Sequence, residues 1–433
     1  MIRLMKNILH EIMHSQYVKN LFILTSGVGL SQLIPLLLLP LLTRFFSPVE
    51  FGVLALFLAI VQLLSTTTTF RLEMAVLLPK KDSDAAILCL ISFFTLFTSV
   101  LLISFLFLIL SSCGVLDSIK NILFNNNVHE LYTLLIYLIP LGILLMGCYN
   151  ILYSWNNRLE LYKNMSYSHL VHSFLSTPLA IVLSFSSLQF IALILGQIIG
   201  RFLACFLLIK SFFNIISEIS KSDFLNKSKV LLSKYRKFIF FETPHSILNF
   251  VSQKYIIAFF TAFFGLFTVG IFDLSDKILG KPLGIISNSF KTVFYKRLTT
   301  AKDKISIFKK SILLMTVISF VLTTPFYLIP DTFFIVLLGQ EWSDTGRYIQ
   351  LICPLLFSRF VFNVVTPAIS YTLQNHFLLI WQIFYMICLV LLFSIVQEFN
   401  VEKVLFVYSI FGALMYVVLG WIAFLVLKKH IQK

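Results

Sequence analysis

Charged residues are scarce in this sequence, and their scarcity excludes most soluble proteins. Of the 433 residues only 12% are charged, whereas 58% are hydrophobic. A soluble domain carries about twice that share of charge. Because a chain of this composition cannot cover its surface with groups that water solvates, we expect it to fold inside a membrane.

Sequence signatures of enzymes and of ATP-driven pumps are also missing. No G-x-x-x-x-G-K-[ST] motif occurs, because Gly280-Lys281 lacks the upstream glycine and Pro282 follows where Ser or Thr should stand. The six cysteines show no close metal-ligand spacing, so we interpret them as small core residues without disulfides. We predict no catalytic residue, no cofactor and no metal site.

His10-Glu11-Ile12-Met13-His14 matches H-E-x-x-H, a pattern that binds zinc in metalloproteases. It stands in a basic, amphipathic stretch, and the apolar run that follows offers no third ligand. An interfacial helix explains it better. The first twenty residues also lack the apolar core of a cleavable signal peptide, so we expect the N-terminus to stay on the side where it is made.

Apolar runs of about 20 residues, the length an α-helix needs to cross a bilayer, recur along the whole chain. Runs such as 93–110 are apolar on every face, whereas a membrane β-strand alternates apolar and polar residues. We therefore predict an all-α membrane protein. Its twelve expected spans are 20–42, 51–70, 85–111, 131–153, 167–186, 189–209, 239–263, 267–290, 309–329, 348–371, 377–396 and 403–427.

Basic residues are distributed unevenly between the predicted loops. If the N-terminus is inside, the cytoplasmic segments hold most of the lysines and arginines, and the opposite side holds only Arg44, Lys120, Arg347 and Lys403. Because basic loops are retained in the cytoplasm, we predict that both termini are cytoplasmic. The net charge of +15 is then a topology signal, and no nucleic-acid partner is expected.

The central segment 210–238 separates six predicted spans from six. Both halves contain Phe-Phe followed six residues later by Gly, as Phe45-Phe46 with Gly52 and as Phe263-Phe264 with Gly270. The match is short, but it falls in the turn between the first two spans of each half, where an internal duplication predicts it. We predict an N-terminal lobe, a cytoplasmic linker and a C-terminal lobe at 1–209, 210–238 and 239–433.

The linker 210–238 and the segment 291–310 each carry seven basic residues. These could attract anionic lipid headgroups, but retention on the cytoplasmic side is the simpler interpretation and the one we favour. Two G-x-x-x-G pairs, Gly196 with Gly200 and Gly280 with Gly284, would let helices approach closely. With twelve spans to pack, we favour contacts within the chain over dimerisation.

Ionisable residues inside the spans are informative, because a charge at mid-membrane costs about 3 kcal/mol. In the eighth span Asp273, Lys277 and Lys281 follow one another at one-turn intervals on one face, with Asp276 beside them. This helix is expected to line a polar path. The alternative is that Asp273 and Lys277 form an ion pair with a structural role.

Cations outnumber carboxylates in these spans, and an unpaired surplus suits an anionic substrate. Arg359 is the strongest candidate, because its own helix offers no acidic residue within a turn. The alternative is that Lys281 and Arg359 extend from near a helix end towards the membrane surface. We predict a substrate cavity that contains Arg201, Lys254, Lys277, Lys281, Arg359 and Asn363.

Two loop motifs resemble a known family. Leu42-Thr43-Arg44-Phe45-Phe46-Ser47-Pro48-Val49-Glu50-Phe51-Gly52 resembles the LTR-x-x-SP-x-(E/D)-(F/Y)-G turn of Wzx-type oligosaccharide flippases, and Phe70-Arg71-Leu72-Glu73-Met74-Ala75-Val76 resembles their LRYE-x-A-(I/V) loop, with Leu72 in place of Tyr. Further similarities follow at Gly270–Tyr295 and Leu338–Trp342. The matching motif residues include Arg44, Pro48, Gly52, Arg71, Glu73 and Trp342.

This resemblance implies the fold of the multidrug/oligosaccharidyl-lipid/polysaccharide (MOP) exporter superfamily, with two six-helix lobes in a V around a central cavity. It implies a location in the bacterial inner membrane and transport of an O-antigen repeat unit on undecaprenyl pyrophosphate, from the cytoplasmic to the periplasmic leaflet. Membrane lipids, a proton or sodium ion and other O-antigen assembly proteins would be its partners.

Two other functions share parts of this pattern. A small-molecule or multidrug exporter of the same superfamily would keep the fold, but exporters of cations would favour an acidic cavity. An O-antigen polymerase or ligase would need a sizeable periplasmic loop to hold its acceptor. The longest outside segments, 112–130 and 330–346, are too short for that.

Without an ATP site, transport is expected to be driven by an ion gradient through alternating access. A proton-coupled mechanism needs a titratable carboxylate inside the membrane, and Asp276 and Asp273 are the candidates. We prefer Asp276, because Asp273 has the better-placed partner one turn away. A sodium-coupled mechanism would instead use oxygen ligands such as Thr25 and Gln32.

Overall fold

The computed structural model describes residues 16–115, 131–216, 221–300, 303–372, 374 and 376–432. Within these ranges every regular element is a helix, so the predicted all-α class is confirmed. The H-E-x-x-H motif, Lys120 and the side chain of Thr25 lie outside the described residues.

Nine helical segments of the described ranges are long and apolar enough to cross a membrane, and ten if the bent pair Ser26–Leu37 and Leu39–Phe45 counts as one span. Each of the twelve predicted ranges overlaps a helix. Two helices account for the difference in number. The helix Tyr162–Ser184 is long enough but rich in serine, and Thr243–Thr300 holds two predicted spans that meet at Gly265. The φ of 79° at Gly265 is one that glycine adopts easily.

The chain forms two compact units, and the division does not follow the sequence order strictly. Unit 1 contains Met1–Leu38 and Phe57–Ile247, and unit 2 contains Leu39–Leu56 and Leu248–Lys433. The first turns of α4 (Pro48–Thr68) therefore belong to unit 2 and the rest to unit 1. The predicted linker 210–238 and the lobe boundaries beside it stay a prediction.

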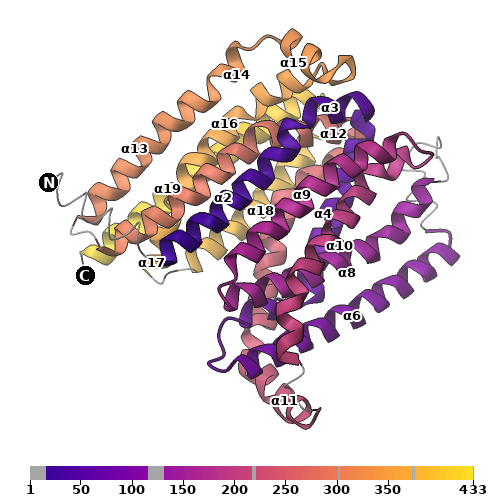
Figure 1. The fold of residues 1–433 in the computed structure, drawn as a ribbon. Coiled ribbons are helices and arrows are strands. Elements are labelled where there is room, and N and C mark those ends of the chain that lie inside the picture. Colours follow the sequence, from indigo (N-terminus) through magenta and orange to yellow (C-terminus); the bar gives the residue numbers. More distant parts are fainter. Residues whose placement is uncertain are drawn as a thin grey trace. The chain divides into compact units, whose positions relative to one another are not determined.

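Unit 1 is built around α9 (Tyr162–Ser184), which packs along α2 (Gln16–Leu37) on one side and α10 (Gln189–Ile216) on the other (Figure 1). Small residues permit this contact, because a Cβ atom on Gly196 would lie 2.3 Å from the Ser176 carbonyl oxygen. The Gly196/Gly200 pair thus packs within the chain. The remaining helices of the unit are α5 (Leu72–Ala75), α6 (Asp82–Ser112), α8 (Leu131–Arg158), α11 (Lys221–Lys237) and the π-helix η1 (Phe238–Glu242).

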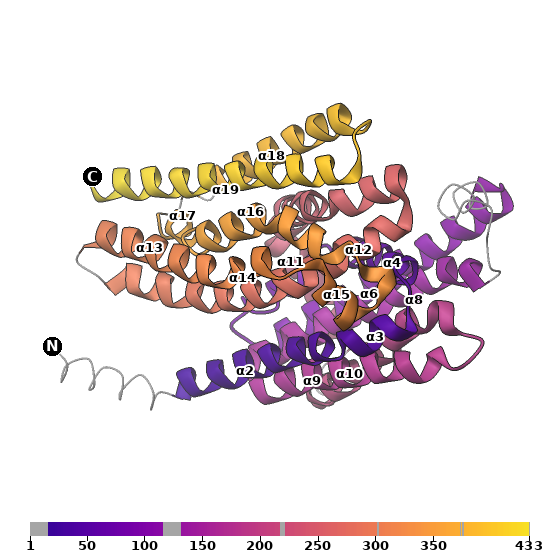
Figure 2. The ribbon, with the colours of Figure 1, turned by 90° about the horizontal axis from the view of Figure 1, so that it is seen from above.

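Unit 2 centres on α16 (Thr345–Asn363) and α19 (Val401–Ile431), which run side by side (Figure 2). The Ser409 hydroxyl accepts a hydrogen bond from the Leu355 amide at 3.1 Å across this contact. The other helices of the unit are α3 (Leu39–Phe45), α12 (Thr243–Thr300), α13 (Lys304–Thr323), α14 (Pro325–Leu328), α15 (Asp331–Leu338), η2 (Gln340–Trp342), α17 (Pro367–Tyr371) and α18 (His376–Val396).

The two short sequence repeats meet in unit 2. A Cβ atom on Gly52 would lie 2.0 Å from the Leu266 carbonyl oxygen, and one on Gly270 would lie 1.8 Å from the Pro48 carbonyl oxygen. The same sequence offset relates Gly52 to Gly270 and Pro48 to Leu266, so the contact is reciprocal, as at a two-fold axis. This reciprocity supports the internal duplication that the sequence suggested.

Candidate functional site

Asp273 and Asp276 of α12 each form an ion pair in unit 2. Lys277 and Asp273 are one turn apart, with the Nζ and Oδ2 atoms 2.5 Å from each other. This is the ion pair that the sequence offered as the alternative to a substrate contact. Lys277 therefore has an ion-pair partner on its own helix, one turn away.

Arg359 also has a carboxylate partner, and that partner comes from another helix. Its Nη2 atom donates a hydrogen bond to Asp276 Oδ1 at 3.3 Å, from α16 to α12. About a third of each side chain is exposed, so solvent or a ligand can reach the pair. As the sequence indicated, Arg359 has no acidic residue within a turn on its own helix. The sequence alone did not predict that α12 supplies the partner.

Gly280 makes room for this pair. A Cβ atom at that position would lie 2.8 Å from Asp276 Oδ1 and 3.2 Å from Arg359 Nη2. No atom lies within 4 Å of the corresponding position on Gly284. Only the first of these glycines therefore shapes the site.

A hollow of about 420 Å³ adjoins the Asp276–Arg359 pair in unit 2. Its polar lining consists of Gln253, Lys254, Asp273, Asp276, Arg359 and Tyr408. Lys254 makes no ion pair in the described part of the chain. Of the other predicted cavity residues, Lys277, Lys281 and Asn363 do not line this hollow, although Lys281 is also without an ion-pair partner among the described residues.

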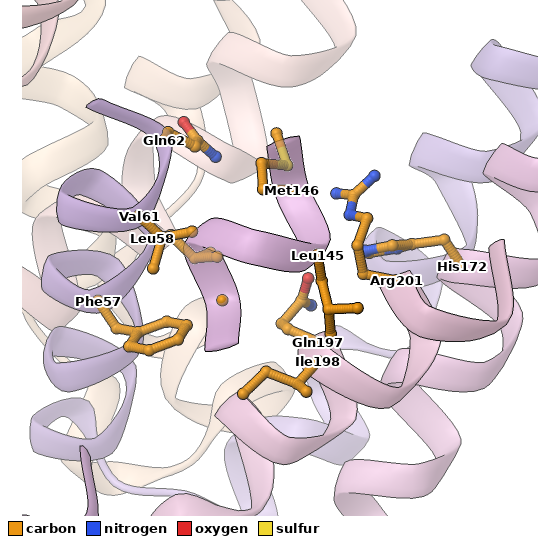
Figure 3. Close-up of a pocket in the computed structure, with 11 residues that line it drawn as sticks. Phe57, Leu58, Val61, Gln62, Leu145, Met146, His172, Gln197, Ile198 and Arg201 are labelled. Atoms are coloured by element: carbon orange, nitrogen blue, oxygen red, sulfur yellow. The ribbon is translucent and has the colours of Figure 1, made fainter. Parts of the chain in front are cut away.

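A second hollow, of about 360 Å³, lies within unit 1 (Figure 3). Arg201 and Gln197 line it from α10, His172 from α9 and Gln62 from α4. Figure 3 shows Arg201 and His172 next to each other on one wall, with Gln62 on the opposite side. The other lining residues are Phe57, Leu58, Val61, Gly142, Leu145, Met146 and Ile198.

Arg201 is held without a carboxylate. Its guanidinium lies 4.5 Å from the centre of the Tyr149 ring, a cation–π contact. No acidic residue occurs in α8, α9 or α10, and Arg201 forms no ion pair among the described residues. The hollow in unit 1 therefore carries an uncompensated positive charge.

Sequence reasoning missed His172 and Gln62. His172 lines the hollow, and its Nε2 atom is buried and has no hydrogen-bond partner in the described structure. The criterion that identified Arg201 and Asn363, a polar residue inside an apolar span, also fits Gln62 and His172, which lie in the second and fifth predicted spans.

The predicted cavity residues thus form two groups. Arg201 lines the hollow of unit 1, whereas Lys254 and Arg359 line that of unit 2. That both groups face one central cavity stays a prediction.

The first family-like motif holds a loop in place rather than a ligand. Arg44 Nη2 donates a hydrogen bond of 2.7 Å to the Val336 carbonyl. Trp342, which is fully buried, donates from Nε1 to the Thr43 carbonyl at 3.3 Å and meets the Phe51 ring edge-on. With Gly52 and Pro48 at the helix crossing, these residues join the start of the chain's second span to the α15–η2 segment.

The second motif forms a buried turn between α4 and α6. Arg71 takes a left-handed φ of 56°, which lets Nε donate to Ser246 Oγ at 2.9 Å while Nη1 lies 3.4 Å from Glu73 Oε1. Glu73 is only 2% exposed. Burial raises the pKa of its carboxyl above the ordinary value, and the charge of Arg71 offsets part of that rise.

Comparison with known proteins identifies both a family and a fold. Residues 41–347 match the family described as polysaccharide biosynthesis protein. An inward-facing multidrug resistance MATE family transporter of the MOP superfamily aligns with a TM-score of 0.61 at 14% identity, over 96% of this chain and 97% of that one. No curated protein matches the chain in sequence.

Two further structures show similar folds. A MATE transporter in complex with MaL6 aligns with a TM-score of 0.51 at 12% identity, over 95% of each chain. A MOP superfamily transporter from Pyrococcus furiosus, whose binding pocket is described as having reverse polarity, aligns with a TM-score of 0.50 at 13% identity, over 94% of each chain. At these identities the likeness shows the fold, and the predicted MATE-like class is confirmed.

Proposed function

Because the chain belongs to the polysaccharide biosynthesis protein family, we propose that it is a Wzx-type flippase for an O-antigen repeat unit. The substrate is an oligosaccharide on undecaprenyl pyrophosphate, moved from the cytoplasmic to the periplasmic leaflet of the bacterial inner membrane. A multi-pass membrane chain with the fold of MOP superfamily transporters supports this proposal.

The observation that carries the proposal is that each hollow is lined by a cation with no ion-pair partner among the described residues. Arg201 is that cation in the hollow of unit 1, and Lys254 is that cation in the hollow of unit 2, beside the Arg359–Asp276 pair. Unpaired cations at membrane depth are costly unless a ligand or water compensates them. A pyrophosphate group offers several charged oxygens for arginine and lysine to bind.

The Asp276–Arg359 pair provides a route for ion coupling. A proton on Asp276 removes the negative charge that holds Arg359, so the protonation state of Asp276 decides whether the guanidinium is paired. Proton binding and substrate binding at this site are therefore linked, and by linkage the effect is reciprocal. The exposure of the pair and the space provided by Gly280 allow the exchange without rebuilding the helices.

The test uses the full chain reconstituted into liposomes that contain a fluorescent undecaprenyl-pyrophosphate oligosaccharide in both leaflets. A membrane-impermeant quencher reports how much label crosses to the outer leaflet. We expect flipping well above that of protein-free liposomes. The matched control is K309Q/K310Q, which removes two exposed charges from α13, a helix that lines neither hollow. Flipping by that control but not by R201Q/K254Q supports the proposal, and no flipping by the wild-type chain overturns it.

A further inference from the structure

The helix α11 and the π-helix η1 that follows it form a basic, exposed element outside both hollows. The segment 221–242 contains six basic residues and only two acidic ones. Among the described side chains of α11, Lys229, Val230, Ser233, Lys234 and Arg236 are exposed. Lys229 and Ser233 are one turn apart, as are Val230 and Lys234, so these four lie along one side of the helix, and Arg236 follows a kink at Tyr235.

The other side of α11 is fixed to a membrane span. Leu231 and Tyr235 are buried, and α11 packs against α6. Lys227 Nζ lies 3.9 Å from Asp84 Oδ1, in the first turn of that span. The packed side therefore holds α11 against the first turn of α6, which is the polar end of that span.

Two exposed phenylalanines follow α11 at the start of the next span. Phe240 is 68% exposed and Phe241 is 72% exposed, and the apolar segment that contains them runs on to residue 299. Bare aromatic rings at the end of a span are unfavourable in water. Next to lysine and arginine they are typical of an interfacial helix, whose rings enter the acyl region while its cations stay among the headgroups.

We propose that the α11–η1 element is a binding surface for anionic phospholipid headgroups, with Lys229, Lys234 and Arg236 as the cationic contacts and Phe240 and Phe241 as the apolar anchors. Retention of a basic loop on one side of the membrane requires only its charge. It does not require a helix packed on a span, nor exposed aromatic rings that follow the charges in the chain. The surface lies outside both hollows, so it does not depend on the proposed substrate.

The experiment measures lipid binding to the detergent-purified full chain by native mass spectrometry, with phosphatidylglycerol and phosphatidylcholine titrated separately. The variant K229Q/K234Q/R236Q is compared with K309Q/K310Q/K429Q, which removes three exposed charges elsewhere. Each basic residue near an anionic surface contributes roughly fivefold to binding. The α11 variant should therefore lose at least about tenfold of its preference for phosphatidylglycerol, and the control should keep most of it.

Two further arms separate the contributions. F240A/F241A should weaken the binding of both lipids by the same factor and leave the preference unchanged. Inorganic pyrophosphate at the same phosphate concentration should not displace phosphatidylglycerol. Equal loss of preference in the α11 variant and its control would overturn the proposal, as would displacement by inorganic pyrophosphate, which would indicate a site for soluble anions. Gel filtration confirms that each variant is folded before binding is measured.

Discussion

The two hollows hold their arginines in different ways. Arg201 in unit 1 rests on an aromatic ring and has no acid in α8, α9 or α10, whereas Arg359 in unit 2 is bonded to Asp276. The first site stays positive whatever the pH, but the charge of the second depends on whether the carboxylate is protonated. The comparison suggests that unit 1 supplies constant attraction for an anion and that unit 2 supplies the exchangeable contact.

The largest effect is expected from breaking the pair in unit 2. Arg359→Gln leaves the Asp276 carboxylate without a partner, which should destabilise the chain by on the order of 3 kcal/mol. This is the lower end of the range for buried ion pairs, because about a third of each side chain is exposed. Thermal unfolding in detergent measures this loss. The double variant D276N/R359Q should recover most of the stability but not the flipping activity. If the double variant is as unstable as R359Q, the two residues are not coupled.

The matching change in unit 1 should affect transport without affecting the fold as strongly. Arg201→Gln removes a cation that has no carboxylate partner, so no charge is left unpaired. Flipping should fall by about 30-fold, since a hydrogen bond to a charged group contributes about 2 kcal/mol. Arg201→Lys should retain part of the rate. Wild-type flipping by R201Q would show that the hollow of unit 1 does not contact the substrate.

Gly280 allows the comparison to be refined within unit 2. Gly280→Ala places a methyl group against Asp276 Oδ1 and Arg359 Nη2, and should weaken transport about fivefold by displacing a pair whose misplacement costs about 1 kcal/mol. Gly284→Ala is the control, because no atom lies within 4 Å of its Cβ position. Equal rates in the two variants would mean that the geometry of the pair is not critical.

The smallest effect concerns the buried turn between α4 and α6. Because the pKa of Glu73 is higher in the folded chain than its ordinary value, its neutral form stabilises the fold at low pH, and this stability is lost as pH rises through the folded pKa. Glu73→Gln should flatten the dependence of the unfolding temperature on pH in the window that begins at the ordinary carboxyl pKa and ends at the raised pKa of folded Glu73. Glu402→Gln, at an exposed ion pair, is the control and should not change the profile.

The sequence predicted helices and spans well, because each span is a local apolar run that needs no knowledge of its neighbours. It also predicted the Asp273–Lys277 pair as an alternative, since both residues lie on one helix. It could not predict that Asp276 meets Arg359, because 83 residues separate them and only the packing of α12 on α16 brings them together. His172 was missed for a related reason, since an uncharged side chain in a serine-rich helix looks like ordinary packing.

The division of α4 between the units was equally invisible in the sequence. Hydropathy marks 51–70 as one span, and it is one helix. Its first turns nevertheless group with unit 2, where Gly52 and Gly270 let two backbones touch. The sequence showed both glycines, and their equivalent positions in the two halves indicated a repeat. It did not predict that the two glycine segments contact each other, which only the structure shows.

The central claim is that Asp276 exchanges Arg359 for a proton and so couples transport to pH. The direct measurement is flipping of the lipid-linked oligosaccharide in liposomes with an imposed pH gradient, by the wild-type chain and by Asp276→Asn. The account predicts that wild-type flux depends on the gradient, whereas the D276N chain, folded and inserted, flips at a rate that does not. Equal gradient dependence in both proteins would contradict it, and a wild-type flux driven by sodium and indifferent to pH would shift attention to oxygen ligands such as Gln32.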